Sequence, residues 1–147
     1  MPRVPNDPTE LVALIAARVE GTVRPFVVAL DGRSGAGKST LARALAESLG
    51  AAIVEGDDFY AGGIELRDDS AETRAAAWID WTRQHAVLET LHSRHEAVWR
   101  AFDWEAFDGR LCDRATKLSP KQIIIFEGVY AARPELARIS HSARGFG

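Results

Sequence analysis

A glycine-rich stretch between an apolar run and a leucine-bearing segment is the feature that most constrains how this chain can fold. Residues 32–39 read GRSGAGKS, which fits the pattern G-x-x-x-x-G-K-[ST]. Glycine weakens the start of a helix, so its repeated use here must serve something other than helix stability. In this pattern the backbone N–H groups wrap a phosphate, provided that a strand precedes the loop and a helix follows it. The alternative is a glycine-rich turn without a ligand.

The segments on both sides supply the required context. Phe26–Leu30 is an unbroken apolar run, as expected of a strand buried on both faces. From about Lys38 to Leu49, leucines recur on one helical stripe, and Gly50 ends the segment. Further helical and apolar runs predict a helix before Gly21 and strands at 52–54 and 123–126. Strand–helix alternation with apolar strands predicts an α/β fold with a parallel sheet.

The rest of the chain is less regular. Residues 61–70 predict a loop, residues 71–100 have a helical pattern, and residues 101–120 are irregular and aromatic. Residues 140–147 have neither a period nor an apolar anchor. We therefore expect a single domain over residues 1–139, followed by a disordered tail.

Size, charge and cysteine content restrict the partners. A chain of 147 residues is long enough for one domain with a buried core. The net charge of −3 and the lack of a Lys/Arg block argue against nucleic acid, whose phosphates require a basic surface. No apolar run approaches the ~20 residues of a membrane span, and no secretory signal pattern opens the sequence. With the lone Cys112, these features predict a cytoplasmic protein with no membrane partner.

Polar clusters follow the predicted strands, where ligands bind in parallel α/β sheets. Lys38 would bridge the terminal phosphates of a nucleotide, and the Ser39 hydroxyl would contact Mg²⁺. The expected phosphate-binding residues are Gly32, Ser34, Gly35, Ala36, Gly37, Lys38, Ser39 and Thr40.

Carboxylates of the other clusters could serve the same ligand. Asp57 or Asp58 could accept a proton from a substrate hydroxyl or hold Mg²⁺ through water. Alternatively, the two aspartates form a solvated acidic turn with no ligand. The phosphate loop that precedes them makes this alternative less favoured. Glu127 follows an Ile-rich strand, where a metal ion or its water shell would satisfy a carboxylate that is costly to bury unpaired. The tryptophans, Trp99 and Trp104 among them, could stack on a base but are more often core residues.

With these residues identified, the chain resembles the uridine kinase branch of the P-loop nucleoside kinases, a neighbour of phosphoribulokinase. The resemblance runs from about Pro25 to Leu136. It rests on GRSGAGKST (32–40), GDDFY (56–60), IDW (79–81), AFDWEAFDGR (101–110) and IIIFEGVYAARPEL (123–136). It implies a P-loop NTPase fold with three α/β/α layers, ATP with Mg²⁺ as phosphoryl donor, and a small alcohol such as a nucleoside as acceptor.

The resemblance also implies roles for single residues. Asp57 would be the base that deprotonates the acceptor hydroxyl, and Lys38 would hold the β and γ phosphates. Ser39 and Glu127, with Asp57 nearby, would organise Mg²⁺. The implied substrate contacts are Asp58, Tyr60, Asp80 and Phe102, with Asp80 a candidate for the ribose hydroxyls.

The chain departs from the family in two places. Phe102 and Phe107 stand where the family's base-recognition segment has a tyrosine and a histidine, which changes the available hydrogen bonds and argues against uridine. Family members also continue with a further strand, an arginine-bearing lid helix and a final helix–strand unit. We therefore expect an incomplete, C-terminally truncated domain in which residues 26–30 form an exposed edge that is prone to self-association.

Two functions of different classes follow from these features. The first is an ATP-dependent small-molecule kinase with Asp57 as base. The second is an ATP-binding module that transfers nothing, expected if the arginines that stabilise the transferring phosphoryl group are missing. A panel of nucleosides and sugars distinguishes the two, and it also tests a gluconate- or shikimate-like kinase.

Overall fold

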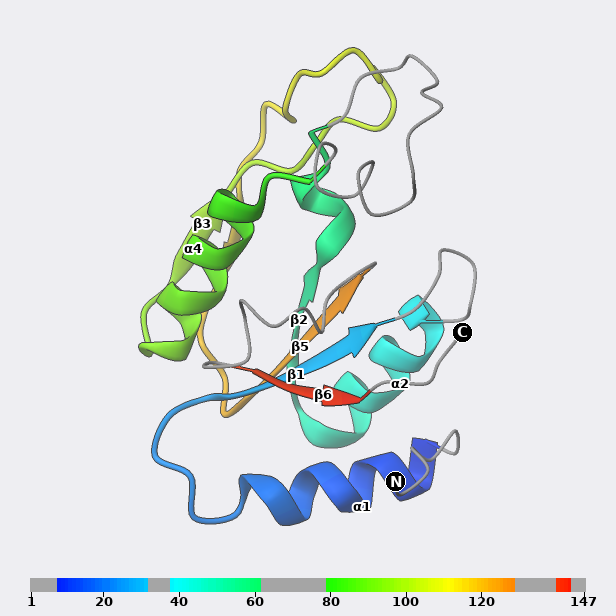
Figure 1. Ribbon diagram of the computed structural model, residues 1–147, viewed down its shortest axis with the longest axis vertical. Helices are drawn as coiled ribbons and strands as arrows, with labels where there is room; N and C mark the ends of the chain where they lie inside the picture. The colour runs from blue at the N-terminus through cyan, green and yellow to red at the C-terminus, as the bar shows by residue number, and fades with distance from the viewer. Residues whose placement is uncertain (1–7, 32–37, 62–78, 129–139, 144–147) are drawn as a thin grey trace.

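A parallel four-stranded sheet forms the centre of the molecule (Figure 1). The computed structural model describes residues 8–31, 38–61, 79–128 and 140–143. In spatial order, the strands are β2 (Ala52–Glu55), β5 (Ile123–Gly128), β1 (Phe26–Asp31) and β6 (Ser140–Ala143). Every neighbouring pair is parallel, which confirms the α/β class expected from the sequence.

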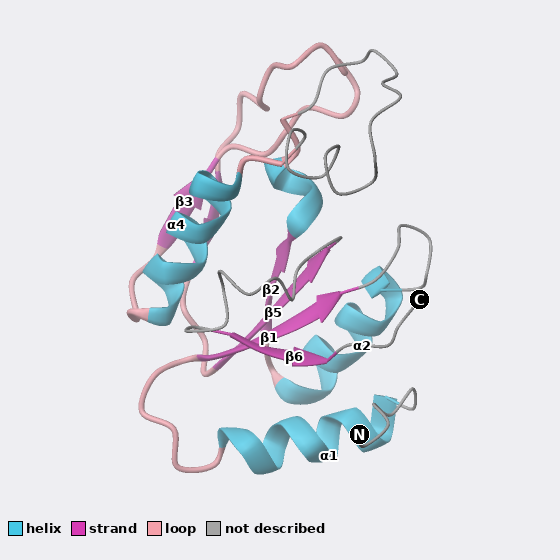
Figure 2. Cartoon of the chain, in the orientation of Figure 1, coloured by secondary structure: helices cyan, strands magenta, loops and turns pink. Residues whose placement is uncertain are grey.

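Helices cover both faces of this sheet (Figure 2). α1 (Pro8–Val19) and α2 (Lys38–Leu49) pack on one face, and α4 (Trp81–His92) packs on the other. The predicted positions of α1, β1, α2, β2 and β5 are confirmed within a few residues. None of the helices within the described ranges is long and apolar enough to cross a bilayer.

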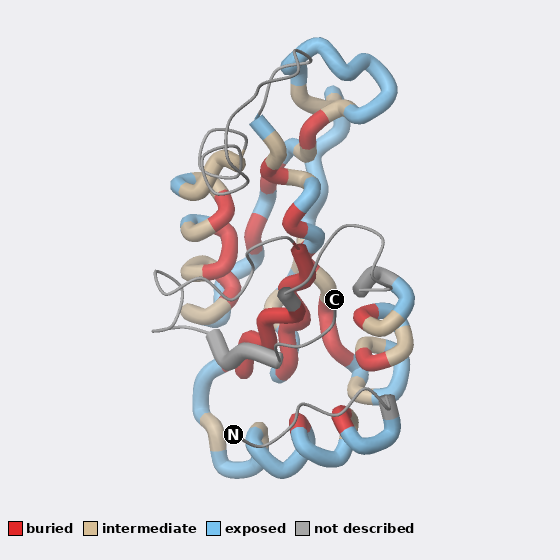
Figure 3. Tube along the Cα trace, turned by 45° about the vertical axis from the view of Figure 1, so that its right-hand side comes forward, coloured by how far each residue is buried: buried red, intermediate tan, exposed pale blue. Residues whose placement is uncertain are grey.

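Two apolar cores lie on opposite faces of the sheet, and buried residues follow the central strands (Figure 3). Successive strand residues point to opposite faces. Ile123 and Ile125 therefore pack with α1 and α2, whereas Ile124 and Phe126 pack with α4. Because β5 is buried along its whole length, its sequence is an uninterrupted apolar run up to Glu127.

The helical interpretation of residues 71–100 is wrong beyond His92. A turn at residues 93–94, where Arg94 has φ 66°, ends α4, and β3 (Ala97–Trp99) follows. β3 pairs antiparallel with β4 (Thr116–Leu118), inside the segment that the sequence predicted to be irregular. Val98 follows Leu91 at a helical spacing, but a short apolar run such as Ala97–Trp99 cannot be assigned to a helix or a strand by periodicity alone.

β6 corrects two expectations about the end of the chain. Ser140–Ala143 pairs in parallel register with Val27–Leu30, so these residues are not a disordered tail and this stretch of β1 is not an exposed edge. The pairing uses backbone groups, which would be unsatisfied at an open edge and which need no apolar side chains to bond. The physical reason for expecting self-association through β1 is thereby removed.

The carboxyl ends of β2 and β5 meet at two glycines. A Cβ atom built on Gly56 would lie 2.9 Å from the carbonyl oxygen of Glu127 and 3.1 Å from the Cα of Gly128. Both contacts are with backbone atoms, which cannot rotate away. Glycine at these positions therefore lets the 3-10 turn η1 (Gly56–Phe59), which carries the two aspartates, lie against the end of β5.

We expect the Gly56→Ala variant to unfold more easily than the unchanged chain, by about 1–3 kcal/mol, the usual cost of overpacking. The reason is the contact between the new Cβ and the backbone of β5. Urea unfolding measures the difference. Ser48→Ala, at an exposed position of α2, is the control and should stay within about 0.5 kcal/mol. Equal stability of the two variants would show that β2 and β5 separate freely at this end.

Candidate functional site

The structure fixes the two ends of the predicted phosphate loop. β1 ends at Asp31, and α2 begins at Lys38, with Ser39 and Thr40 next along the helix. The predicted phosphate-binding residues that lie outside the described residues are Gly32, Ser34, Gly35, Ala36 and Gly37. The loop therefore connects the carboxyl end of a central strand to a helix N-terminus, which is the context that phosphate binding requires.

Glu127 lies on β5, directly beside the strand that leads into this loop. The parallel register pairs it with Leu30 of β1 on one side and with Glu55 of β2 on the other. Its exposed fraction is 6%, and a carboxylate that is so buried needs partners; the residue takes part in at least one interaction. The structure thus brings Glu127 to the same edge of the sheet as the phosphate loop, while its role as a magnesium ligand stays a prediction.

The two aspartates of η1 differ in what holds them. Trp99 Nε1 donates a hydrogen bond to Asp58 Oδ2 at 2.9 Å. The pKa of Asp58 is raised mainly by burial; the Trp99 hydrogen bond opposes this shift, and the charge of Asp57 adds to it. Asp57 is exposed, and no group in the described part of the chain bonds to its carboxylate. Asp57 is therefore the more accessible carboxylate of this turn.

A third carboxylate lies close to these aspartates. The pKa of Glu55 is raised, first by partial burial of its carboxyl group and then by the charges of Asp58 and Asp57. Arg43 on α2 opposes the shift without cancelling it. A divalent cation would relieve this repulsion. The described ranges contain no ready-made group of three His, Cys, Asp or Glu ligands, but Mg²⁺ commonly binds through one or two carboxylates together with phosphate oxygens and water.

An aromatic cluster of Tyr60, Phe102, Trp104 and Phe107 borders η1. The Tyr60 ring centroid lies 4.8 Å from that of Trp104 and 4.9 Å from that of Phe102. Phe102 is 2% exposed, whereas Trp104 is 47% and Phe107 37% exposed. Trp104 Nε1 donates to the carbonyl oxygen of Asp57 at 3.2 Å, which joins the cluster to the acidic turn. The cluster therefore presents two partly exposed rings, Trp104 and Phe107, beside the acidic turn.

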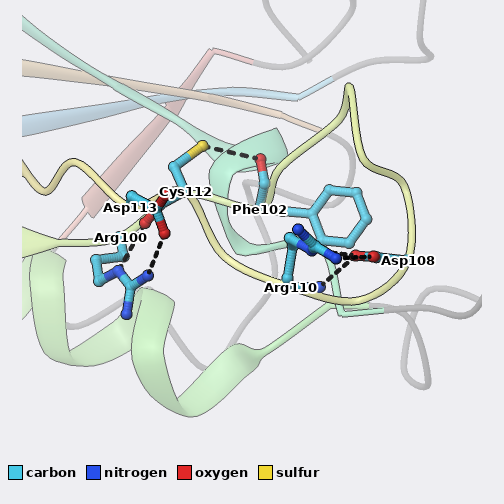
Figure 4. A network of polar contacts seen from close by, with 6 residues as sticks. All are labelled: Arg100, Phe102, Asp108, Arg110, Cys112 and Asp113. Carbon is cyan, nitrogen blue, oxygen red and sulfur yellow. Dashed lines mark hydrogen bonds and ion pairs between the residues drawn. The ribbon is translucent and has the colours of Figure 1, made fainter.

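A loop over residues 101–112 carries three of these rings and is closed at its base (Figure 4). The backbone N–H of Cys112 donates to the Ala101 carbonyl at 2.8 Å, and Cys112 Sγ donates to the Phe102 carbonyl at 3.8 Å. Phe102 also forms an isolated antiparallel bridge with Leu111. These contacts anchor the loop on the side where Phe102 packs.

The tip of the same loop is ordered by its own polar residues. Asp103 Oδ1 accepts hydrogen bonds from the backbone N–H groups of the two residues at positions 105 and 106. Arg110 pairs with Asp108 at 2.8 Å, and its hydrogen bonds lower the pKa of that carboxyl (Figure 4). Phe107 has φ 46°, a left-handed backbone that costs about 1 kcal/mol or more in a non-glycine residue. Strain at an exposed ring of the cluster is typical of a segment that binds a ligand.

The remaining predicted substrate residues are already engaged in the structure. Asp80 caps α4, because its Oδ1 accepts from the Arg83 backbone N–H at 3.1 Å. Its other oxygen lies 4.0 Å from the Arg83 guanidinium. Burial raises the pKa of Tyr60, so its phenol remains a protonated donor. The ribose role of Asp80 and the substrate roles of Tyr60 and Phe102 stay predictions.

Sequence reasoning overlooked part of this site. Tryptophan is more often a core residue, and the sequence gives no reason to treat Trp104 differently. In the structure, however, nearly half of the Trp104 side chain is exposed. The signal that could have found it is the close spacing of three aromatic residues, Phe102, Trp104 and Phe107, in a segment without regular periodicity.

Comparisons with known proteins agree with this architecture. The profile of the AAA domain family matches residues 27–102, more than half of the 147 residues. No curated protein matches the sequence.

Three solved structures share the fold. A protein described as a possible uridine kinase from Bacillus stearothermophilus is 23% identical, with a TM-score of 0.70 over 90% of this chain and 75% of that one. A protein described as a fructose transport system kinase from Silicibacter sp. is 22% identical, with a TM-score of 0.71 over 94% and 73%. D-glycerate 3-kinase from Cryptococcus neoformans is 15% identical, with a TM-score of 0.56 over 84% and 52%. At these identities the likenesses concern the fold, and they confirm the P-loop NTPase class.

We expect Glu55→Gln to raise the free energy of unfolding at pH 7. The folded chain raises the pKa of Glu55, so its charged form is penalised at neutral pH. That penalty decreases as the pH falls through the raised pKa of Glu55 in the folded chain, and it vanishes below the pKa of the unfolded chain, about 4.3. Glutamine removes the charge. The gain in the free energy of unfolding should therefore be largest at pH 7 and should disappear as the pH approaches the pKa of the unfolded chain.

Urea unfolding at several pH values measures this difference. Glu47→Gln, at an exposed position of α2, is the matched control. A loss of stability in Glu55→Gln at pH 7 would mean that the attraction to Arg43 outweighs burial and the aspartate charges.

Proposed function

The chain belongs to the AAA domain family, and we propose that it transfers the γ-phosphoryl group of ATP to a hydroxyl group of a small molecule. The observation that carries this proposal is the exposed carboxylate of Asp57, which no described group bonds. It lies at the carboxyl edge of the sheet, where β1 leads into the phosphate loop and α2 begins. A phosphoryl transferase needs a phosphate cradle and a proton acceptor at one such edge.

The donor binds at the loop between β1 and α2. From the sequence pattern, backbone N–H groups of the loop and the N-terminus of α2 would surround its phosphates, and Lys38 would bridge the β and γ phosphates. When Mg²⁺ accompanies the nucleotide, it neutralises part of the phosphate charge, and Ser39, Asp57 and Glu127 would hold it. Burial is the first cause of the raised pKa values of Glu55 and Asp58, and the charge of Asp57 adds to both shifts; that like-charge contribution supports a cation in this place.

In the transfer step, the acceptor oxygen forms a bond to the γ phosphorus in line with the bond that breaks. The bond from the γ phosphorus to the β–γ bridging oxygen breaks, and ADP leaves with that oxygen. Asp57 accepts the proton of the acceptor hydroxyl, so the oxygen attacks without carrying a positive charge. The charge of Lys38 stabilises the phosphoryl oxygens during the transfer.

We take the acceptor to be a nucleoside or a similar sugar-containing alcohol. The partial exposure of Trp104 and Phe107 supports a planar ring in the acceptor, since such rings stack on aromatic side chains. The structural relatives are described as kinases of uridine, of a fructose transport system and of D-glycerate, so all three acceptor types belong in the test panel. A cytoplasmic location remains a prediction from the sequence.

We expect Asp57→Asn to reduce kcat by about 10²–10⁴-fold, the usual contribution of a positioned base, while ATP still binds. ADP release with nucleosides, sugars and glycerate measures turnover, and the thermal shift with Mg-ATP measures binding. Lys38→Ala is the comparison variant and should lose the shift as well. If the unchanged chain binds ATP and no acceptor supports turnover, the chain is a nucleotide-binding module that transfers nothing.

We expect Trp104→Leu to raise the KM of a nucleoside acceptor about 5- to 150-fold, which corresponds to about 1–3 kcal/mol of stacking. Trp104→Phe keeps a ring and should keep most of that affinity. The KM of ATP should not change in either variant. A nucleoside KM that is insensitive to both substitutions would contradict a ring-bearing acceptor at this cluster.

A further inference from the structure

We infer that Trp99 is a positioning residue: through its hydrogen bond to Asp58 it orders η1, so that the neighbouring Asp57 carboxylate is the one that meets the acceptor. This inference rests on the proposed function, because that function gives Asp57 its role as base. Trp99 itself lies on β3 and belongs to the core beside α4.

The backbone carbonyl groups of η1 accept hydrogen bonds from donors in other segments of the chain. The carbonyl groups of residues 57–59 accept hydrogen bonds from Trp104 Nε1 at 3.2 Å, from the Phe102 N–H at 2.9 Å and from the Asp80 N–H at 2.8 Å. All three donors belong to segments that follow the turn in the chain. The main chain of the turn is therefore held through its carbonyl groups, and the Trp99 hydrogen bond adds a further contact through the Asp58 side chain.

Trp99 supplies the hydrogen bond to a carboxylate of this turn. Its Nε1 lies 2.9 Å from Asp58 Oδ2, and its ring stacks on Phe59 with centroids 6.0 Å apart. The indole is 6% exposed, and pairing with Thr116 of β4 fixes its backbone. A donor that is held this firmly sets the orientation of the Asp58 side chain.

The hydrogen bond from Trp99 gives two neighbouring carboxylates different roles. Asp57 and Asp58 are identical groups on consecutive residues, and either could compete for a cation or for a substrate proton. Binding one of them to an indole leaves the other as the group that is open to a ligand. Without Trp99 Nε1, the Asp58 carboxylate would be free to turn towards the same ligand and displace it from Asp57.

The surroundings of Trp99 make the inference testable by substitution. One side of the indole borders a surface hollow of about 470 Å³, which Arg83 and Val98 also line. A smaller ring at this position therefore does not leave a sealed void in the core. Trp99→Phe removes the N–H donor and keeps an aromatic ring for the contact with Phe59.

Steady-state kinetics of four variants tests the inference. Trp99→Phe and Asp58→Leu should each lower kcat about 10²-fold, the cost of a slightly misplaced catalytic group, with the KM of ATP unchanged. Asp58→Asn keeps an oxygen that accepts the indole N–H and should lower kcat much less than Asp58→Leu does. Val98→Ala, whose side chain is 54% exposed on the same strand, is the control.

The double variant distinguishes one shared bond from two separate effects. If both residues act through their hydrogen bond, combining Trp99→Phe with Asp58→Leu should lower kcat no further than either change alone. Additive losses would overturn the inference. So would an unchanged kcat in Trp99→Phe, or a loss in Asp58→Asn as large as in Asp58→Leu, which would mean that the charge of Asp58 acts directly.

Hydrogen exchange separates failure of the inference from failure of the proposed function. Backbone amides of residues 56–60 should exchange faster in Trp99→Phe and Asp58→Leu than in Asp58→Asn and the unchanged chain. This readout needs no turnover. If the unchanged chain phosphorylates no acceptor, the proposed function fails, and with it the catalytic part of the inference. Equal exchange in all four chains overturns the positioning by Trp99 itself, whether or not phosphoryl transfer occurs.

Discussion

The contact between the backbones of Gly56 and Gly128 is the constraint on which the candidate site depends. It is so close that a Cβ at either position would lie 3.1 Å from the Cα of the other. The turn that carries Asp57 can lie against the end of β5 because neither residue has a side chain. Since β5 is also paired with β1, the same contact fixes the acidic turn relative to the strand that enters the phosphate loop. The geometry of the site is therefore set by main-chain packing before any polar side chain contributes.

Much of this arrangement could be predicted from the sequence because it is encoded locally. Central strands of a parallel sheet are buried on both faces, so β1 and β5 are unbroken apolar runs. A polar residue directly after such a run marks the carboxyl end of the strand, as Glu127 does near the end of β5. The order of apolar run, glycines and helical stripe likewise identified the two ends of the phosphate loop.

The parts that the sequence leaves open or predicts wrongly depend on contacts between distant residues. β6 has no apolar side chain before Ala143, and its pairing with β1 is visible only once backbone groups at the edge are counted. The difference between Asp57 and Asp58 depends on Trp99, 41 positions further along the chain. Periodicity and charge do not distinguish two adjacent aspartates; the family resemblance implies Asp57 as the base, and the fold adds the hydrogen bond that holds Asp58.

The charge at the sheet edge also limits the form in which a nucleotide can bind. The charge of Asp57 contributes to the raised pKa values of both Glu55 and Asp58, and Glu127 is the register neighbour of Glu55. Bare ATP carries several negative charges and would be repelled by these carboxylates, against which Lys38 and the N-terminus of α2 offer limited compensation. A divalent cation that accompanies the phosphates reverses the sign of that interaction, because it attracts the carboxylates and the phosphate oxygens at once. Under the proposed function, the acidic edge therefore favours the magnesium complex over the free nucleotide.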